Sequence, residues 1–265
     1  MVALLHPGRE SGQAAVESAL VLPLMVLMAL SLLQLTLMQQ AKLMTEYAAY
    51  CAARAGIVWN GHSERMHDAA RVALLPTLGR TDTLPGLGRT WTRARLRDET
   101  LQQLAWPTKG PVVPAVVNGS GLFGQVRVDT VSPSGDALGR SELDFDEPER
   151  AEDVHRQATV LSVRVRYWYE LRVPFANWFL FTTWWATHTG VMPGGARGLE
   201  HTRGHHTLHP SERAVLWGLA TGDISLDAKR GGKHYFIPLT AAYSMRMQSN
   251  FYSKWLMHQN PDGEQ

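Results

Sequence analysis

The stretch GQAAVESALVLPLMVLMAL, residues 12–30, decides the fold of this chain of 265 residues. It opens a long apolar run that extends from Ser18 to Met38 without a charged residue. At about 1.5 Å per residue, a helix over this run would be about 31 Å long, close to the thickness of the hydrocarbon layer of a membrane. The sequence therefore predicts one transmembrane helix.

A cleaved secretory signal is another interpretation of this run. The apolar part of such a signal usually has about 7 to 15 residues and ends in small residues at the cleavage site. Here the run is longer and is followed by Gln39, Gln40 and Lys42, and Tyr50 before Cys51 does not fit a lipoprotein site. We therefore expect the helix to remain in the mature protein.

A single glutamate, Glu17, stands directly before the apolar run. An ionised carboxylate in lipid costs on the order of 2.5 to 3.5 kcal/mol at the centre of a helix and less near its end, so such a residue usually has a partner. Cleavage after Gly12 would supply one, because it creates a charged amine on Gln13, four positions before Glu17. Subunits packed with a small axial offset would then pair one chain's carboxylate with another chain's amine.

On these residues the N-terminal region resembles the TadE-like pseudopilins of tight-adherence pilus systems. The hallmark of that family is a glycine, four residues, a glutamate and an apolar helix, which here are Gly12, Glu17 and the run from Ser18. Family members often have phenylalanine after the glutamate, where this chain has Ser18. The resemblance continues into YAAYCAARAGIV, residues 47–58. An ordinary membrane anchor that carries a boundary glutamate is the alternative.

The resemblance implies a function in assembly rather than catalysis. A prepilin peptidase would remove the cytoplasmic leader, residues 1–12, and leave Gln13 as the first mature residue. The product would be a minor pseudopilin that is built into, or initiates, a tight-adherence (Flp-type) pilus or a secretion pseudopilus. An uncleaved, membrane-anchored binding or sensor domain outside the cytoplasm is the other hypothesis.

The resemblance also implies partners and a location. The partners would be other pilin or pseudopilin subunits, the prepilin peptidase, an inner-membrane assembly platform with its ATPase, and an outer-membrane secretin. The protein would cross the bacterial inner membrane once, with a cytoplasmic N-terminus and a periplasmic domain, and would reach the pilus after assembly.

The residue pattern predicts an α+β, pilin-like fold, in which one long helix packs on a small antiparallel sheet. Helical composition continues from the membrane span to Val58, so we expect one helix over residues 13–58 and an extracytoplasmic domain over residues 59–265. Pro23 lacks the N–H that would reach Ala19 and predicts a bend or local loosening of the helix.

Several shorter elements are predicted beyond the long helix. A second helix is expected from Ser63, as its cap, to Leu75, with Pro76 as its stop. Alternating apolar and polar residues predict strands over residues 161–173 and 235–247, and a shorter one at Val126 and Val128. The stripe expected to pack the long helix on this sheet consists of Leu43, Tyr47, Tyr50, Cys51 and Arg54.

Three segments carry no recognisable motif. The arginine-rich residues 79–97 and the acidic residues 132–153 are expected to be solvated loops. The aromatic segment from Val173 to Ala186 is too short for a second membrane span, and we interpret it as core or as an interface.

Catalysis, metal binding and nucleic-acid binding find no support in the sequence. There is no phosphate-binding loop, dinucleotide fingerprint or nucleophile elbow. The histidines at 201, 205, 206 and 209 lie among Gly198, Gly204 and Pro210, which favours a solvated loop over a metal site. The net charge of +2 excludes a global field for nucleic acid, and the lone Cys51 excludes an internal disulfide. We expect no enzyme activity, no cofactor and no metal.

Overall fold

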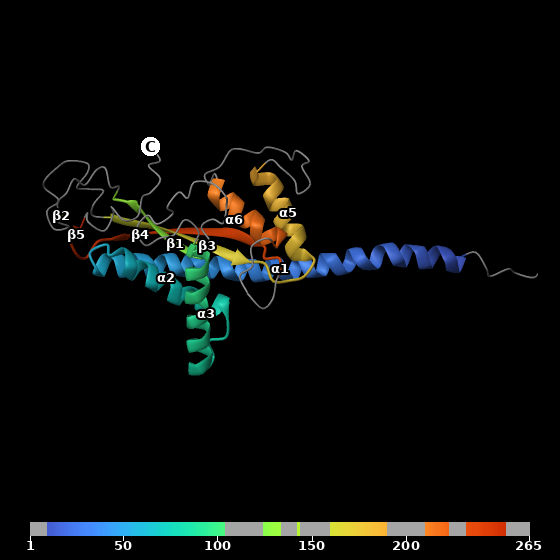
Figure 1. The fold of residues 1–265 in the computed structure, drawn as a ribbon, viewed down its shortest axis with the longest axis horizontal. Coiled ribbons are helices and arrows are strands. Elements are labelled where there is room, and N and C mark those ends of the chain that lie inside the picture. The colour runs from blue at the N-terminus through green and yellow to red at the C-terminus, as the bar shows by residue number, and fades with distance from the viewer. Residues whose placement is uncertain are drawn as a thin grey trace, which may run out of the picture. The chain divides into compact units, whose positions relative to one another are not determined.

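The structure, a computed structural model, describes residues 10–103, 124–133, 142–143, 160–189, 210–222 and 232–252 (Figure 1). The predicted α+β class is confirmed, because a long N-terminal helix and further helices accompany a small antiparallel sheet. The helices are α1 (Glu10–Val58), α2 (Ser63–Leu78), α3 (Leu84–Gln103), α5 (Ala176–Thr189) and α6 (Pro210–Thr221). The strands are β1 (Val126–Ser132), β2 (Glu142–Leu143), β3 (Val160–Glu170), β4 (Phe236–Arg246) and β5 (Phe251–Tyr252).

Contacts within the chain divide it into two compact units. One contains residues 1–38 and 171–203, and the other contains residues 39–170 and 204–265. The helix α1 therefore contributes its first part to one unit and its second part to the other. We predicted boundaries after residue 12, where the leader would be cleaved, and after residue 58, where the extracytoplasmic domain would begin. Both boundaries stay predictions.

The sheet of the second unit has the strand order β1-β3-β4, with both pairs antiparallel. Val165 of β3 is the partner of Val128 on one side and of Ala241 on the other. Every second residue of β3 from Leu161 to Tyr169 is buried, as its alternation predicts. Strands β2 and β5 form a separate two-stranded pair.

The second part of α1 packs with a different face from the one that we predicted. Leu43 and Tyr47 are 55% and 52% exposed, Arg54 is exposed, and Tyr50 and Cys51 are half-buried. The buried face consists instead of Ala41, Thr45, Ala48, Ala49, Ala52, Ala53 and Ile57. Small side chains allow the helix axis to come close to its neighbours, and this close packing outweighs the larger apolar area of the tyrosines.

Gly56 shows how close this approach is. A Cβ atom at this position would lie 2.4 Å from Cδ2 of Leu161 on β3 and 2.7 Å from Sδ of Met66 on α2. Gly56 lies within α1, two residues before the helix ends at Val58. Gly61 has φ +73° and closes the helix end, where its N–H donates to the carbonyl of Gly56 at 2.9 Å.

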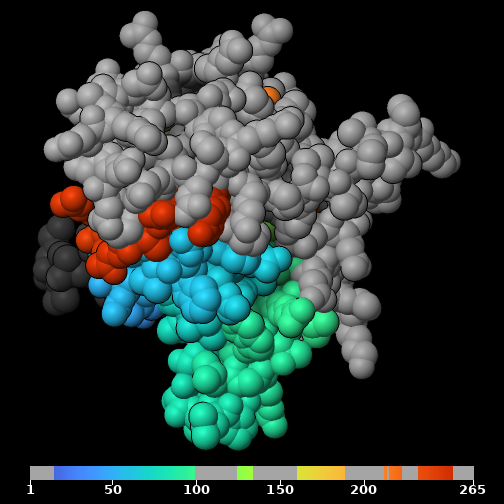
Figure 2. Space-filling view, turned by 90° about the vertical axis from the view of Figure 1, so that its left-hand side faces the viewer, coloured from blue at the N-terminus to red at the C-terminus, as the bar shows by residue number. Residues whose placement is uncertain are grey.

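The turn between α1 and α2 is fastened to the end of β4. Asn60 donates through Nδ2 to the carbonyl of Asn250 at 2.7 Å, and its N–H donates to Oγ of Ser249 at 3.2 Å. Ser249 in turn donates to the carbonyl of Ile57 at 2.8 Å. Figure 2 shows light-blue residues of this part of the chain beside red residues of the segment that contains β4 and β5. These three hydrogen bonds hold the end of α1 against the residues that follow β4.

The helix α2 is longer than predicted and lacks the predicted cap. The residue before the helix is His62, whose side chain makes no capping hydrogen bond, and Ser63 is already helical. The helix also continues through Pro76 to Leu78. Proline removes only one N–H from the ladder, and the N–H of Gly79 still reaches the carbonyl of Leu75 at 3.2 Å.

The arginine-rich residues 79–97, which we predicted to be a loop, mostly belong to α3. Thr83 caps this helix, because its Oγ1 accepts a hydrogen bond from the N–H of Gly86 at 3.2 Å. Asp98 is buried and joins α3 to its neighbours, through an ion pair with Arg71 of α2 and a bond of 2.7 Å from the N–H of Gln125. Of the acidic residues 132–153, only 132–133 and 142–143 are described.

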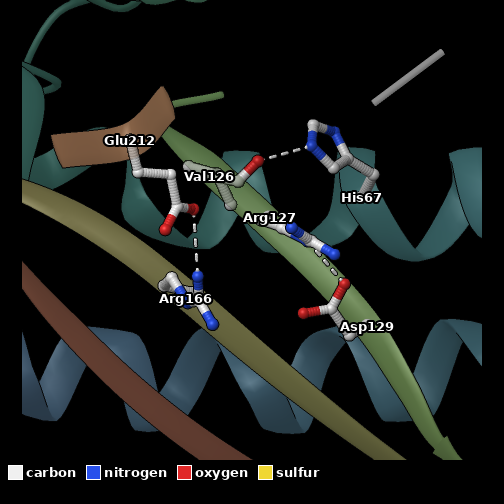
Figure 3. A network of polar contacts seen from close by, with 6 residues as sticks. All are labelled: His67, Val126, Arg127, Asp129, Arg166 and Glu212. Atoms are coloured by element: carbon white, nitrogen blue, oxygen red, sulfur yellow. Dashed lines mark hydrogen bonds and ion pairs between the residues drawn. The ribbon is translucent and has the colours of Figure 1, made fainter. Parts of the chain in front are cut away.

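Polar contacts attach one helix to β1 and another to β3 (Figure 3). On β1, the carbonyl of Val126 lies 2.7 Å from Nε2 of His67 on α2. On β3, Arg166 donates through Nη1 to Glu212 of α6 at 3.2 Å. The helix α6, which we did not predict, also buries Leu216 and Leu219.

A second ion-pair group lies at the end of β3. Glu170 accepts from Nη1 of Arg97 at 2.8 Å and from Nδ1 of His234 at 2.7 Å. Burial alone raises the pKa of the Glu170 carboxyl, but the hydrogen bond from His234 and the charge of Arg97 outweigh burial and hold the pKa below its ordinary value of 4.5. Glu170 thereby connects α3, β3 and the residues before β4.

We expect Glu170→Gln to lower the free energy of unfolding by about 2–3 kcal/mol at neutral pH, because the variant loses charge-assisted bonds to two partly buried donors. A carboxyl whose pKa is depressed by folding stabilises the protein above its unfolded pKa, and this stabilisation is lost as the pH falls through the folded pKa. The difference between variant and parent should therefore shrink below about pH 4.5.

Urea unfolding of the full chain in detergent micelles, followed by tryptophan fluorescence at several pH values, measures this difference. The matched control is Asp82→Asn, which removes the carboxylate of an exposed ion pair with Arg80 and should change stability little. A Glu170→Gln variant as stable as the control at neutral pH would contradict the structural role of the group.

Candidate functional site

The predicted cleavage site lies in the first turns of α1. This helix begins at Glu10, so the peptide bond between Gly12 and Gln13 has a helical backbone. A peptidase needs an accessible bond, and the start of a helix opens most easily because its first N–H groups have no partner within the helix. Glycine lowers helix stability by about 1 kcal/mol relative to alanine, which favours local opening at this position.

Glu17 is exposed on the surface of α1 at the edge of the apolar run. Its helix neighbours Val16, Leu20 and Val21 are exposed as well. Along the sequence of α1, the next charged residue after Glu17 is Lys42. At about 1.5 Å per residue, this cation lies roughly 37 Å away along the helix. The helix itself thus offers Glu17 no cation in the direction of the span.

The surface of α1 from Val16 to Leu37 is mostly exposed and apolar. Among the described helices, α1 is the one long and apolar enough to cross a membrane. Its exposed large side chains include Leu20, Leu22, Leu24, Met25, Met28, Leu32, Leu33 and Leu35. So large an apolar surface needs lipid or other helices around it.

Pro23 lies within α1 without ending it, since the helix continues on both sides. Its ring leaves the carbonyl of Ala19 without the usual intrahelical donor. The bend or loosening that we predict at this point is compatible with the continuous helix and stays a prediction.

Gln34 is the functional candidate that sequence reasoning missed. It is fully buried although most of its neighbours on α1 are exposed. Its Oε1 accepts from the N–H of Val173 at 2.8 Å and from the N–H of Arg172 at 3.1 Å. An isolated glutamine in an apolar run gives no signal of its partner, because the two backbone donors lie some 138 residues away in sequence.

Residues 12–54 match the family model described as TadE-like protein. This segment is TadE-like. The match begins at Gly12, contains Glu17 and ends at Arg54, so it confirms the resemblance over residues 12–54. It also indicates involvement in a tight-adherence pilus system. Comparisons with curated proteins and with solved structures give no significant match.

The TadE-like segment occupies most of α1 and includes each predicted processing and assembly residue: Gly12, Gln13, Glu17 and Pro23. These four positions follow one another along a single helix. The buried small-residue face from Ala41 to Ala53 belongs to the same segment. The segment therefore contains both an apolar surface long enough to cross a membrane and a face that packs in the folded domain.

Outside the TadE-like segment, a metal site would require several ligating side chains that hold the ion together. The described parts of the chain contain no group of three metal-binding side chains. The histidines at 201, 205, 206 and 209 lie outside the described residues. A hollow lined by Arg71, Trp91, Asp98 and Gln125 has a volume of about 10 Å³, room for about one water molecule.

Proposed function

We propose that this protein is a minor pseudopilin, built into or initiating a tight-adherence pilus or a secretion pseudopilus after cleavage behind Gly12. The observation that carries the proposal is one unbroken helix, α1, with the Gly12 to Glu17 pattern at its beginning and a domain-packing face at its end. Such a helix can join a soluble domain to a bundle of apolar helices, which an assembling subunit requires.

The charge at Glu17 sets the register of assembly in this proposal. Cleavage gives Gln13 a positive amine, and four helical residues place it about 6 Å along the axis from Glu17. A neighbouring subunit displaced by that distance brings its amine beside the carboxylate. The pair removes most of the cost of a charge at an apolar boundary, so a mispaired subunit is disfavoured.

The exposed apolar surface of α1 allows transfer from membrane to filament. In the membrane it contacts lipid, and in a filament it contacts the helices of other subunits. Because lipid and the helices of other subunits are both apolar, the transfer changes the burial of apolar surface little. Packing between helices and polar pairs then determine whether α1 prefers the membrane or the filament. The assembly platform with its ATPase would supply the work of extraction.

The partners and location follow from this role. The prepilin peptidase and the platform act at the bacterial inner membrane, where the leader is cytoplasmic and the folded domain is periplasmic. Other pilin-like subunits bind α1 after cleavage, and the secretin passes the filament through the outer membrane. The protein needs no enzyme activity or cofactor for this role.

Fractionation of cells that express the complete pilus system tests the proposal. Shearing should release part of the protein with the surface filaments, and deletion of the prepilin peptidase should abolish that release. A chain that stays entirely in the membrane fraction in both strains would refute assembly and favour the uncleaved binding or sensor domain.

A further inference from the structure

The helix α5 presents an exposed aromatic surface at its beginning. Phe175, directly before the helix, is 74% exposed, and Trp178 and Phe179 are 56% and 45% exposed. From Val173 to Thr189 the sequence contains no aspartate, glutamate, lysine or arginine. Phe181 and Trp185 of the same helix are buried, so α5 is held in the fold by one face while the other displays aromatic rings.

Gln34 connects this aromatic surface to the outer end of the membrane span. Its two hydrogen bonds go to Arg172 and Val173, which immediately precede the exposed Phe175. Gln34 lies four residues before Met38, the last residue of the apolar run, which is about 6 Å along the helix. Figure 1 shows α5, in gold, starting beside α1 and leading away from it. These parts belong to one compact unit.

The exposed side of α5 changes from aromatic to polar along its length. Its first turn carries Trp178 and Phe179, whereas Thr183, Thr187 and His188 are the exposed residues further along. The aromatic end is the one fastened to Gln34. A helix whose first turn lies at the edge of an apolar layer and whose last turn lies in water would show this change from aromatic to polar side chains.

We propose that Phe175, Trp178 and Phe179 are seated in the outer lipid–water interface of the membrane that α1 crosses. This inference rests on the membrane span of the proposed function. Tryptophan favours the interface, where its apolar ring meets headgroups and water, and phenylalanine lies on the apolar side of helices bound there. The exposed rings follow directly after the backbone that Gln34 binds near the end of the apolar run, so the bilayer is the occupant that fits them.

Before assembly, the protein then has two contacts with the bilayer: the helix α1 and the beginning of α5. The second contact limits rotation and tilt of the domain on the membrane, because interfacial aromatic side chains anchor a protein at a fixed depth. Extraction into a filament requires that this contact be released together with the span.

Depth-dependent fluorescence quenching tests the inference on the full chain. In a Cys51→Ser background, single cysteines replace Trp178 or Phe175, and each is labelled with an environment-sensitive nitrobenzoxadiazole dye. The chain is reconstituted in vesicles of phosphatidylcholine and phosphatidylglycerol that carry bromine atoms on their acyl chains near the headgroups. Leu32, exposed in the span, and Val58, exposed at the far end of α1, are the control positions.

Quenching at positions 178 and 175 should be several-fold greater than at position 58, which lies about 30 Å beyond Met38 along α1. Suppose that position 32 is strongly quenched but that positions 178 and 175 are quenched no more than position 58. That result would overturn the placement of α5 in the interface while leaving the span intact. Absence of quenching at position 32 would overturn the span and, with it, this inference. Two label positions guard against a local effect of either substitution.

Discussion

Gly12→Leu is expected to leave the leader on the chain in cells that contain the prepilin peptidase. A side chain at this position adds bulk beside the bond to be cut, and leucine also stabilises the helical backbone by about 0.8 kcal/mol relative to glycine, which opposes local opening. Immunoblotting should show the longer chain alone, and no protein should appear in sheared filaments.

The matched control is Gly8→Leu, which makes the same change within the leader but four positions before Gly12. This variant should be processed like the parent. Full processing of Gly12→Leu would refute cleavage behind Gly12. Equal failure of both variants would instead indicate a general sensitivity of the leader.

Glu17→Gln is expected to leave cleavage intact and to remove the protein from filaments. The variant retains shape and hydrogen-bonding capacity, but it lacks the charge that pairs with the amine of Gln13. A lost pair of about 2 kcal/mol corresponds to roughly thirtyfold weaker incorporation. Quantitative mass spectrometry of sheared filaments, relative to the amount in the membrane, measures the ratio.

Glu10→Gln serves as the control for this prediction, because Glu10 belongs to the leader and is absent from the mature chain after cleavage. Its incorporation should equal that of the parent. Unchanged incorporation of Glu17→Gln would contradict the pairing of charges, even if cleavage occurs as proposed.

The long helix and the central strands could be predicted because their patterns are strong and local. An uncharged apolar run, followed by residues that favour helix, left little alternative to one continuous α1. Alternation in β3 identified the face that carries Leu161, Val163 and Val165, although Trp168 on the opposite face is buried as well. The TadE-like match rests on the same local pattern from Gly12 to Arg54.

The face of α1 that packs in the domain could not be found by hydrophobicity alone. Tyrosines at 47 and 50 suggested a buried stripe, but Tyr47 stacks on Tyr50 at 6.2 Å between ring centres, and Tyr50 meets Tyr243 of β4 edge-on at 5.3 Å. Alanine is only weakly hydrophobic, so a row of alanines does not stand out as a buried face. These alanines stabilise the fold because their small side chains let α1 pack closely, and this depends on the shape of the neighbouring elements.

The errors at α2 and α3 have a common physical cause. Proline at position 76 and the arginines of residues 79–97 were interpreted by local preference, whereas tertiary contacts decided the outcome. Thr83 and Pro85 were a usable signal for the beginning of α3, because a capping residue followed by proline in the first turn is typical of helix starts. Asp98 then secures the helix through partners that are remote in sequence.

Distant polar partners are the part of the site that one sequence cannot reveal. Gln34 binds the backbone before α5, and Glu170 binds Arg97 and His234 across the fold. Neither glutamine nor glutamate has a periodic pattern that would indicate these partners. Only the three-dimensional arrangement shows that Gln34 in the apolar run lies beside the residues that precede the aromatic α5.

The mass of the mature chain recovered from cells tests the central claim most directly. Intact-protein mass spectrometry, combined with sequencing of the N-terminal peptide, determines where the chain begins. The account predicts a chain that starts at Gln13 with Glu17 as its fifth residue. A chain that still begins at Met1, or one that begins beyond Met38, would contradict it.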